Sequence, residues 1–208
     1  MKIKYYLIHG VDSSRKQFML DQFTAYGIDN NDVTWLCHPN KDEINRDIKN
    51  AYCAKKDLSL GQISCTIKHY MAIKDIVDNQ HDIAVIMEDN VAFKSNVPAR
   101  IEQYLQQLPP DWDTLFDSDW KTFTETPVTP DKIVYKKSNE ITELCHGGSR
   151  LANFILINLN AAKKMYSTYL PFTQVSDWYY NDLLRRHNMN SYWSEPANTY
   201  HVNRQSTA

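Results

Sequence analysis

The sequence predicts a single α/β domain in which a mixed, mostly parallel central sheet is flanked by helices. Short apolar runs alternate with amphipathic stretches along the first half of the chain, as in successive strand–helix–strand units. The 208 residues, of which 42% are hydrophobic, suffice for one substantial core. No repeat, low-complexity tract or linker interrupts them, so residues 1–208 are expected to form one domain.

Three strands and two helices are expected in the first half. They are a strand over 3–8, a helix ending at Gly27, a strand over 33–36, a long helix from Leu60 and a strand over 83–87. Asp12-Ser13-Ser14 is expected to cap the first helix, because side-chain oxygens of such residues can accept from the free N–H groups of the first turn. Ile63, Ile67, Tyr70 and Val77 recur at helical spacing, which predicts that the long helix is amphipathic.

The second half continues the alternation less regularly. The expected elements are a helix over 97–107, a strand over 113–116, a strand over 153–158, a helix around 161–166 and a helix over 176–187. Pro109-Pro110 ends the first of these helices, since proline cannot continue a helix. The polar segment 117–140 reads as loops or a flap, and the tail from Asn190 as irregular structure.

Composition excludes several classes of protein. The formal charge of −2 argues against a nucleic-acid binder. The four cysteines include no CxxC pair, which argues against a zinc ribbon or disulfide scaffold and for a reducing compartment. The apolar run at the start is too short for a signal peptide, and no run has membrane-spanning length. We therefore expect a cytoplasmic protein without a transmembrane segment; oligomeric state is left open.

The strongest local signal is the acidic end of the strand over 83–87. The apolar run stops at Glu88-Asp89-Asn90 and resumes as Val91-Ala92-Phe93. Carboxylates at the end of a buried strand are costly unless they meet a metal, a ligand or fixed donors. Three consecutive oxygen-bearing side chains can hold Mg²⁺ or Mn²⁺. The alternatives are a turn with two solvated acids and, as a further class, a metal-dependent hydrolase or nuclease.

Several short motifs surround this signal in a fixed order. They are Gly61-Gln62-Ile63-Ser64-Cys65 with Lys68-His69, Glu88-Asp89-Asn90-Val91, Pro109-Pro110-Asp111-Trp112-Asp113, Gly147-Gly148-Ser149, Ala161-Ala162-Lys163-Lys164 and Val175-Ser176-Asp177. This order resembles glycosyltransferase family 25, which contains bacterial lipooligosaccharide sugar transferases and collagen-type galactosyltransferases. No single motif is specific, but the shared order covers roughly residues 3–180.

The resemblance implies a GT-A-type fold, which is a Rossmann-like nucleotide-binding sheet with the acceptor site on its C-terminal part. It implies inverting transfer of a hexose, galactose or glucose, from a UDP-sugar to a hydroxyl of a glycan or hydroxylated protein. Glu88 and Asp89 would contact the ribose or the metal, Mn²⁺ or Mg²⁺, and the third position would bind the metal. That position is Asn90, where the family pattern has Asp. The alternative is a degenerate member that binds a glycan or nucleotide without transferring it.

Other candidate residues follow from the same resemblance and from residue chemistry. Asp177 is the candidate general base, because an inverting transfer needs a carboxylate to take the acceptor proton; the alternative is an ordinary acid in a first helical turn. His201 is a candidate last metal ligand. The pairs Trp112-Asp113 and Gly147-Gly148 fit acceptor-side walls and a tight turn, since glycine permits close approach of the backbone.

The donor side has four further candidates beside Glu88 and Asp89. His9 and Gly10 end the first strand, where backbone can approach the nucleotide base. Arg15 suits the oxygens of a diphosphate. His69 lies on the long helix and either touches the donor or packs in the core.

Overall fold

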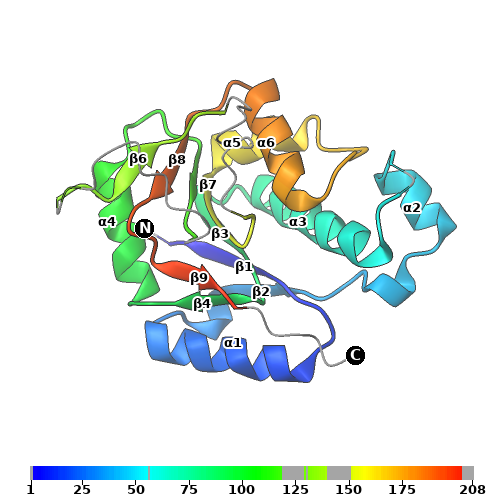
Figure 1. The fold of residues 1–208 in the computed structure, drawn as a ribbon, viewed down its shortest axis with the longest axis horizontal. Coiled ribbons are helices and arrows are strands. Elements are labelled where there is room, and N and C mark those ends of the chain that lie inside the picture. The colour runs from blue at the N-terminus through cyan, green and yellow to red at the C-terminus, as the bar shows by residue number, and fades with distance from the viewer. Residues whose placement is uncertain (1, 56, 119–128, 130, 140–150, 203–208) are drawn as a thin grey trace.

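The computed structural model describes residues 2–202 except 56, 119–128, 130 and 140–150, and the elements form one mixed sheet between helices (Figure 1). The seven strands lie in the order β2-β1-β3-β7-β5-β8-β6. Their bounds are β1 Lys4–Ile8, β2 Val33–Leu36, β3 Ile83–Glu88, β5 Thr114–Phe116, β6 Val134–Lys136, β7 Phe154–Asn158 and β8 Ser191–Ser194. β4 (Val91–Phe93) and β9 (Thr199–His201) form a separate antiparallel pair.

The pairing of the strands confirms a mixed α/β sheet. β2, β1 and β3 are parallel neighbours, and so are β5 and β8, whereas β3–β7, β7–β5 and β8–β6 are antiparallel. Half of these six pairs are therefore parallel, fewer than the sequence suggested. Two of the three parallel pairs, β1–β2 and β1–β3, lie in the first half of the chain, where helices provide the crossovers that parallel strands require.

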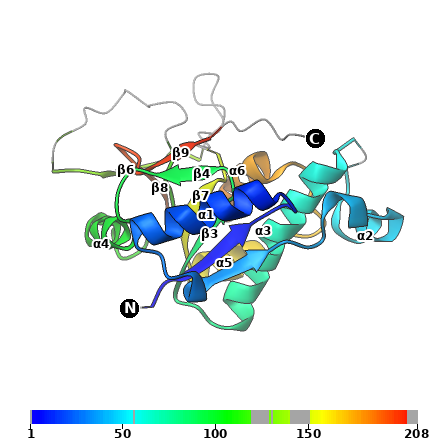
Figure 2. The same cartoon turned by 90° about the horizontal axis from the view of Figure 1, so that it is seen from below.

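Helices cover both faces of the sheet (Figure 2). Their bounds are α1 Ser13–Tyr26, α2 Arg46–Tyr52, α3 Leu60–Asp78, α4 Val97–Gln107, α5 Leu159–Tyr166 and α6 Ser176–Arg186, with short 3-10 turns over Asn30–Asp32 and Lys41–Glu43. One apolar cluster joins α3, α5 and α6 to alternate residues of the central strands, including Tyr6 and Ile86. The other joins α1 and α4 to the strand residues that alternate with these and point to the opposite face of the sheet, including Leu7 and Met87.

Local signals set the ends of the predicted helices. The Asp12 side chain accepts hydrogen bonds from the N–H groups of Ser14 at 2.8 Å and Arg15 at 3.3 Å, and Gly27 ends α1 in the left-handed region at φ 81°. Ser59 and Gln62 form a capping box at the start of α3. The bounds predicted for α4 are confirmed to the residue.

Three parts of the prediction are wrong. The tail after Asn190 is not irregular, because it forms β8 and β9. α2 and β4 were not anticipated, and the loop segment 117–140 contains β6, although 119–128, 130 and 140 lie outside the described residues. These short elements are held by partners distant in sequence, as β8 is by β5 and β6, so local pattern carries little information about them.

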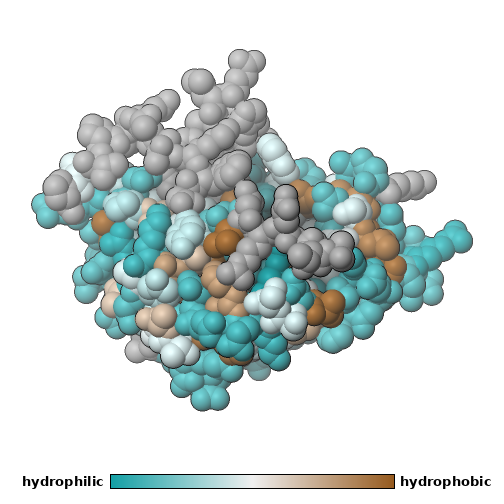
Figure 3. Space-filling model, turned by 60° about the horizontal axis from the view of Figure 1, so that its bottom comes forward, coloured by the Kyte–Doolittle hydropathy of each residue, from teal (hydrophilic) through white to brown (hydrophobic). Residues whose placement is uncertain are grey.

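The surface is largely hydrophilic on the face shown in Figure 3, with scattered apolar side chains. None of the helices in the described residues is long and apolar enough to cross a membrane. The exposed large hydrophobic side chains are Val11, Leu60, Trp178 and Tyr200.

Candidate functional site

A polar cavity of about 220 Å³ opens at the carboxyl ends of β1 and β3. Its lining consists of Ile8, His9, Gly10, Arg15, Asn40, Lys41, Gly61, Ser64, Cys65, Lys68, Glu88, Asp89 and Asn90. The residues come from the ends of two parallel strands, the start of α1, one face of α3 and the start of the 3-10 turn Lys41–Glu43. In α/β sheets this is the edge at which ligands bind.

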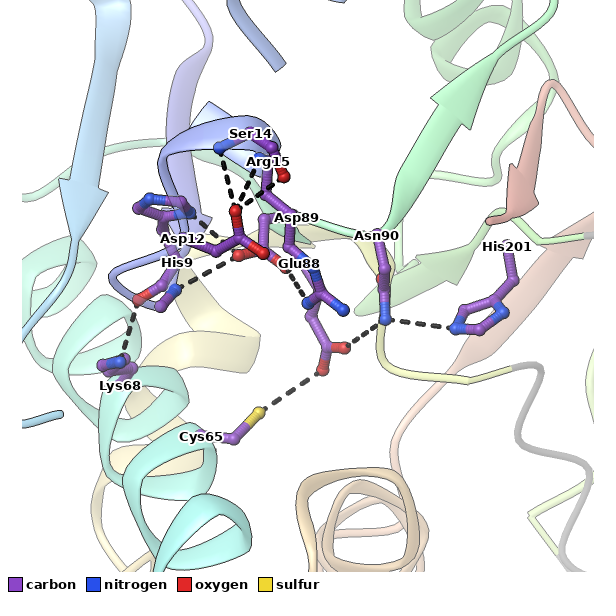
Figure 4. Close-up of polar contacts among 11 residues, drawn as sticks. His9, Asp12, Ser14, Arg15, Cys65, Lys68, Glu88, Asp89, Asn90 and His201 are labelled. Atoms are coloured by element: carbon purple, nitrogen blue, oxygen red, sulfur yellow. Dashed lines mark hydrogen bonds and ion pairs between the residues drawn. The ribbon is translucent and has the colours of Figure 1, made fainter. Parts of the chain in front are cut away.

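Asp89 organises one side of the cavity (Figure 4). Its Oδ2 accepts hydrogen bonds from His9 Nδ1 at 2.8 Å and the Gly10 N–H at 3.1 Å, and its Oδ1 accepts from Arg15 at 2.9 Å. Burial alone would raise the pKa of Asp89, but the hydrogen bonds from His9 and Gly10 and the charge of Arg15 outweigh it and lower the pKa. Both carboxylate oxygens are thus already used by protein groups.

Glu88 points the other way, toward α3. Its Oε1 lies 3.1 Å from His69 Nε2 and 3.6 Å from Cys65 Sγ, and its Oε2 lies 3.5 Å from Asn90 Nδ2. His69 is fully buried, and its Nδ1 lies 3.3 Å from the hydroxyl of Tyr180. The two consecutive acids therefore serve different surroundings, because alternate residues at a strand end face opposite sides.

Asn90 contacts His201, which is 111 positions away in the sequence. The β4–β9 pair places Val91 opposite His201, and the N–H of Val202 donates to Asn90 O at 2.8 Å. Asn90 Nδ2 then lies 3.1 Å from His201 Nε2, so Glu88, Asn90 and His201 converge (Figure 4). The sequence-based association of Asn90 with His201 therefore corresponds to a direct contact.

The donor set at this point fits a divalent cation. Asn90 Oδ1 is buried and has no hydrogen-bond partner among the described residues. A half-turn of the amide exchanges Oδ1 for Nδ2 and presents an oxygen between a carboxylate oxygen and an imidazole nitrogen. Carboxylate and carbonyl oxygens suit Mn²⁺ and Mg²⁺. Among the first-row divalent ions, Mn²⁺ has the lowest affinity for a site that combines oxygen and nitrogen ligands.

Asp177 lies in the first turn of α6 and interacts electrostatically with Glu88. Its Oδ1 accepts a hydrogen bond from the Ala152 N–H at 2.5 Å. Burial raises the pKa of Asp177, the charge of Glu88 raises it further, and the Ala152 hydrogen bond, His69 and His201 offset this only in part. A carboxylate with a raised pKa is a stronger base than an ordinary one, which suits proton abstraction.

The structure brings most of the predicted residues to one place. Six of them line the cavity: His9, Gly10, Arg15, Glu88, Asp89 and Asn90. His69, Asp177 and His201 are not among the described residues that line the cavity, but each interacts with Glu88 or Asn90.

The structure bears on one of the two residue pairs predicted for the acceptor side. Asp113 is buried at the start of β5, where it forms an ion pair with Lys164 at 2.8 Å and accepts from the Asn190 N–H. β5 and β3 both pair antiparallel with β7, so they run in the same direction and the start of β5 lies opposite the Glu88 end. The interpretation of Trp112 and Asp113 is therefore wrong. Gly147 and Gly148 lie outside the described residues.

The sequence reasoning missed Lys68 and Cys65 as site residues. Lys68 is 3% exposed and donates to His9 O at 2.9 Å, and burial lowers its pKa. Cys65 precedes His69 by four residues and therefore shares its face of α3. Helical spacing relative to His69 was the signal that would have found Cys65.

The chain has a mixed α/β sheet with a cavity at the carboxyl ends of its parallel strands, which is the arrangement of ligand-binding α/β domains. The chain belongs to glycosyltransferase family 25: the sequence model of that family, described as an LPS biosynthesis protein family, matches residues 2–182.

Individual relatives are distant. A Bos taurus protein described as "Probable inactive glycosyltransferase 25 family member 3" is 28% identical over 64 residues, which is 29% of this chain and 11% of that protein. The chain thus matches about a tenth of the length of this relative. Among solved structures, A197 from STIV has a TM-score of 0.51 at 10% identity, covering 100% of this chain and 97% of that one, and shares the overall fold. The galactosyltransferase LgtC, solved with donor and acceptor sugar analogs, has a TM-score of 0.46 at 10% identity, covering 98% and 88%.

Proposed function

We propose that the chain is an inverting glycosyltransferase that moves a hexose, galactose or glucose, from a UDP-sugar to a hydroxyl of a glycan or hydroxylated protein. Family membership supports glycosyl transfer in general. One observation carries the proposal: Glu88, Asn90 and His201 converge beside a cavity at the strand ends although Asn90 and His201 are 111 positions apart in the sequence, and the basic carboxylate Asp177 is adjacent.

The cavity supports binding of the nucleotide diphosphate. Arg15, Lys41 and Lys68 line it, and cationic side chains favour phosphate oxygens. Asp89 is the counter-charge that holds Arg15 in place, and it also fixes His9 and the Gly10 backbone. In this proposal Asp89 positions the donor pocket, and its two oxygens are engaged there rather than on a metal.

Glu88, Asn90 and His201 would hold the divalent cation, Mn²⁺ or Mg²⁺. When bound, such an ion neutralises the charge that develops on a departing diphosphate. Asn90 contributes a neutral oxygen where a carboxylate would contribute a charge, so the affinity for metal is expected to be weak.

Asp177 supports the acceptor half of the reaction. It is proposed to take the proton of the acceptor hydroxyl as the new glycosidic bond forms. Its neighbour Trp178 is 47% exposed and lines a shallow groove with Gln62 and Gln174. An exposed indole offers an apolar face for a sugar ring, and amides offer hydrogen bonds to its hydroxyls.

A degenerate, non-catalytic member is the second candidate, and Asn90 is the observation that favours it. The absence of the carboxylate expected by the family pattern removes one charge from the metal set. In that case the chain binds a nucleotide or glycan without turnover. An Asn90→Asp variant that acquires Mn²⁺-dependent donor hydrolysis would support degeneracy, whereas clear turnover by the wild type excludes it.

The experiment is a screen of nucleotide sugars for hydrolysis and transfer, with and without Mn²⁺, combined with calorimetric titration of UDP. Turnover of a UDP-hexose with inversion at the anomeric carbon is the expected result. Binding of UDP without turnover of any sugar selects the degenerate reading. If no nucleoside diphosphate binds with or without metal, the transferase proposal is wrong, and so is a degenerate member that binds nucleotides.

A further inference from the structure

Cys65, His69 and Glu88 form a cluster of three potential metal ligands at the wall of the cavity, which Cys65 and Glu88 line. Cys65 and His69 are four residues apart on α3, so both face the end of β3. Cys65 Sγ lies 3.6 Å and His69 Nε2 lies 3.1 Å from the same oxygen, Glu88 Oε1, and the three ligand atoms all lie within 4.8 Å of one another.

The two distances to Glu88 Oε1 are close to the edges of a tetrahedral zinc site. Zinc binds sulfur at about 2.3 Å and nitrogen or oxygen at about 2.1 Å, which places tetrahedral sulfur and oxygen ligands about 3.6 Å apart and nitrogen and oxygen ligands about 3.4 Å apart. The observed sulfur–oxygen distance agrees, and the nitrogen–oxygen distance of 3.1 Å requires only a small opening.

The surroundings provide the outer partners that a metal site needs. The Tyr180 hydroxyl lies 3.3 Å from His69 Nδ1 and its ring packs edge-on against the imidazole, which keeps Nε2 directed at Glu88. Ser176 Oγ lies 3.8 Å from Cys65 Sγ. Cys65 and Glu88 also line the open cavity, which gives an ion an entry path and leaves room for a water as fourth ligand.

We propose that Cys65, His69 and Glu88 bind one thiophilic divalent cation, of which Zn²⁺ is the natural candidate. A thiolate and an imidazole select such an ion over Mn²⁺ or Mg²⁺, which prefer oxygen ligands. The thiolate and the carboxylate together neutralise its charge. This site is separate from the set formed with Asn90 and His201, but it shares Glu88 with that set, so an ion bound here withdraws Glu88 from the donor side.

The test uses the folded, full-length chain without nucleotide or sugar, so its outcome is independent of the proposed transferase activity. Metal-free protein is titrated with Cd²⁺ while the ultraviolet thiolate-to-metal charge-transfer band is recorded. We expect one equivalent of Cd²⁺ to produce the band, Zn²⁺ to displace it and excess Mn²⁺ to leave it unchanged.

Variants assign the band to the cluster. Cys65→Ser should lose it although the other three cysteines remain, and Cys37→Ser should retain it. His69→Gln and Glu88→Gln keep the thiol and should weaken Cd²⁺ binding more than tenfold, whereas Tyr180→Phe, which removes only an outer partner, should weaken it by about tenfold. Far-ultraviolet circular dichroism verifies that each variant is folded. If Cys65→Ser does not fold, the Cd²⁺ affinities of His69→Gln and Glu88→Gln show whether the cluster binds the metal.

The proposal is overturned by the absence of the band in the wild type, by its persistence in folded Cys65→Ser, or by equal displacement with Mn²⁺. It is also overturned if His69→Gln and Glu88→Gln, both folded, bind Cd²⁺ as tightly as the wild type.

Discussion

Replacing Asn90 by Asp tests the electrostatics of the candidate donor site most directly. The substitution keeps the shape of the side chain and places a second carboxylate 3.5 Å from Glu88 Oε2, where the Asn90 amide nitrogen now lies. Two unit charges at that separation repel each other by about 5 kcal/mol at an effective dielectric constant of 20. Glu88 and Asn90 are both partly exposed, so water screens the pair and about 2 kcal/mol is expected to remain.

This repulsion has opposite consequences without and with metal. Without metal, a loss of about 2 kcal/mol lowers the melting temperature of a chain this size by about 4 to 8 °C. A divalent cation removes the repulsion, so the same energy appears as a gain of about 30-fold in Mn²⁺ affinity. Differential scanning fluorimetry with and without Mn²⁺ and calorimetric titration of Mn²⁺ measure the two effects.

Asn31→Asp is the matched control, because it adds the same charge at an exposed position that does not line the cavity. It should leave both the melting temperature and the Mn²⁺ affinity unchanged. If Asn90→Asp melts with the wild type in the absence of metal and binds Mn²⁺ no more tightly, the reasoning that Asn90 completes a cation site with Glu88 is refuted.

Three further predictions concern the neighbouring residues. Asp177→Asn should lower the rate of transfer by about 10²- to 10⁴-fold without weakening UDP binding, and an unchanged rate would exclude the base role. Because the pKa of Asp177 is raised above its usual 3.8, kcat/KM of the wild type should begin to fall at a higher pH than it would with an ordinary aspartate as the base. Asp89→Asn should destabilise the fold by about 3 kcal/mol near neutral pH, since it removes the charge of a buried carboxylate that is paired with Arg15 and His9. Because the folded pKa of Asp89 is lowered, its stabilisation is present above the unfolded pKa and is lost as pH falls through the folded pKa, so wild-type and Asp89→Asn melting curves should converge in acid; a constant gap would contradict this. Trp178→Ala should raise the KM for the acceptor several-fold and leave the KM for the donor unchanged, which initial-rate kinetics on both substrates would reveal; equal effects on the two would place Trp178 outside the acceptor groove.

Local chemistry explains why much of the fold could be predicted. The Asp12 cap, the Gly27 terminus and the Ser59 capping box mark helix ends by hydrogen bonds within a few residues, and these ends were predicted closely. The acidic strand end at Glu88 was equally visible, because buried carboxylates require partners. The residues that Glu88 and its neighbours contact could not be predicted from the local sequence.

The remaining features depend on contacts between distant residues. Nothing around Cys65 or Lys68 indicates that the end of β3 will lie against their face of α3, and only the assembled sheet brings Glu88 there. The contact of Asn90 with His201 likewise requires β9 to pair with β4 across most of the chain. The resemblance to a family pointed to His201, whereas the residues near it gave no comparable signal.

The position of β8 inside the sheet has a consequence for synthesis on the ribosome. β8 lies between β5 and β6 in the sheet, and Thr114 of β5 pairs with Ser191 of β8, which is 77 positions later in the sequence. At translation rates of about 5 to 20 residues per second, β5 exposes an unpaired edge for about 4 to 15 s. A nascent chain that stalls before β8 therefore presents a template for aggregation, and it cannot acquire the His201 contact. Completion of the sheet and completion of the donor site are thus one late event in the maturation of the chain.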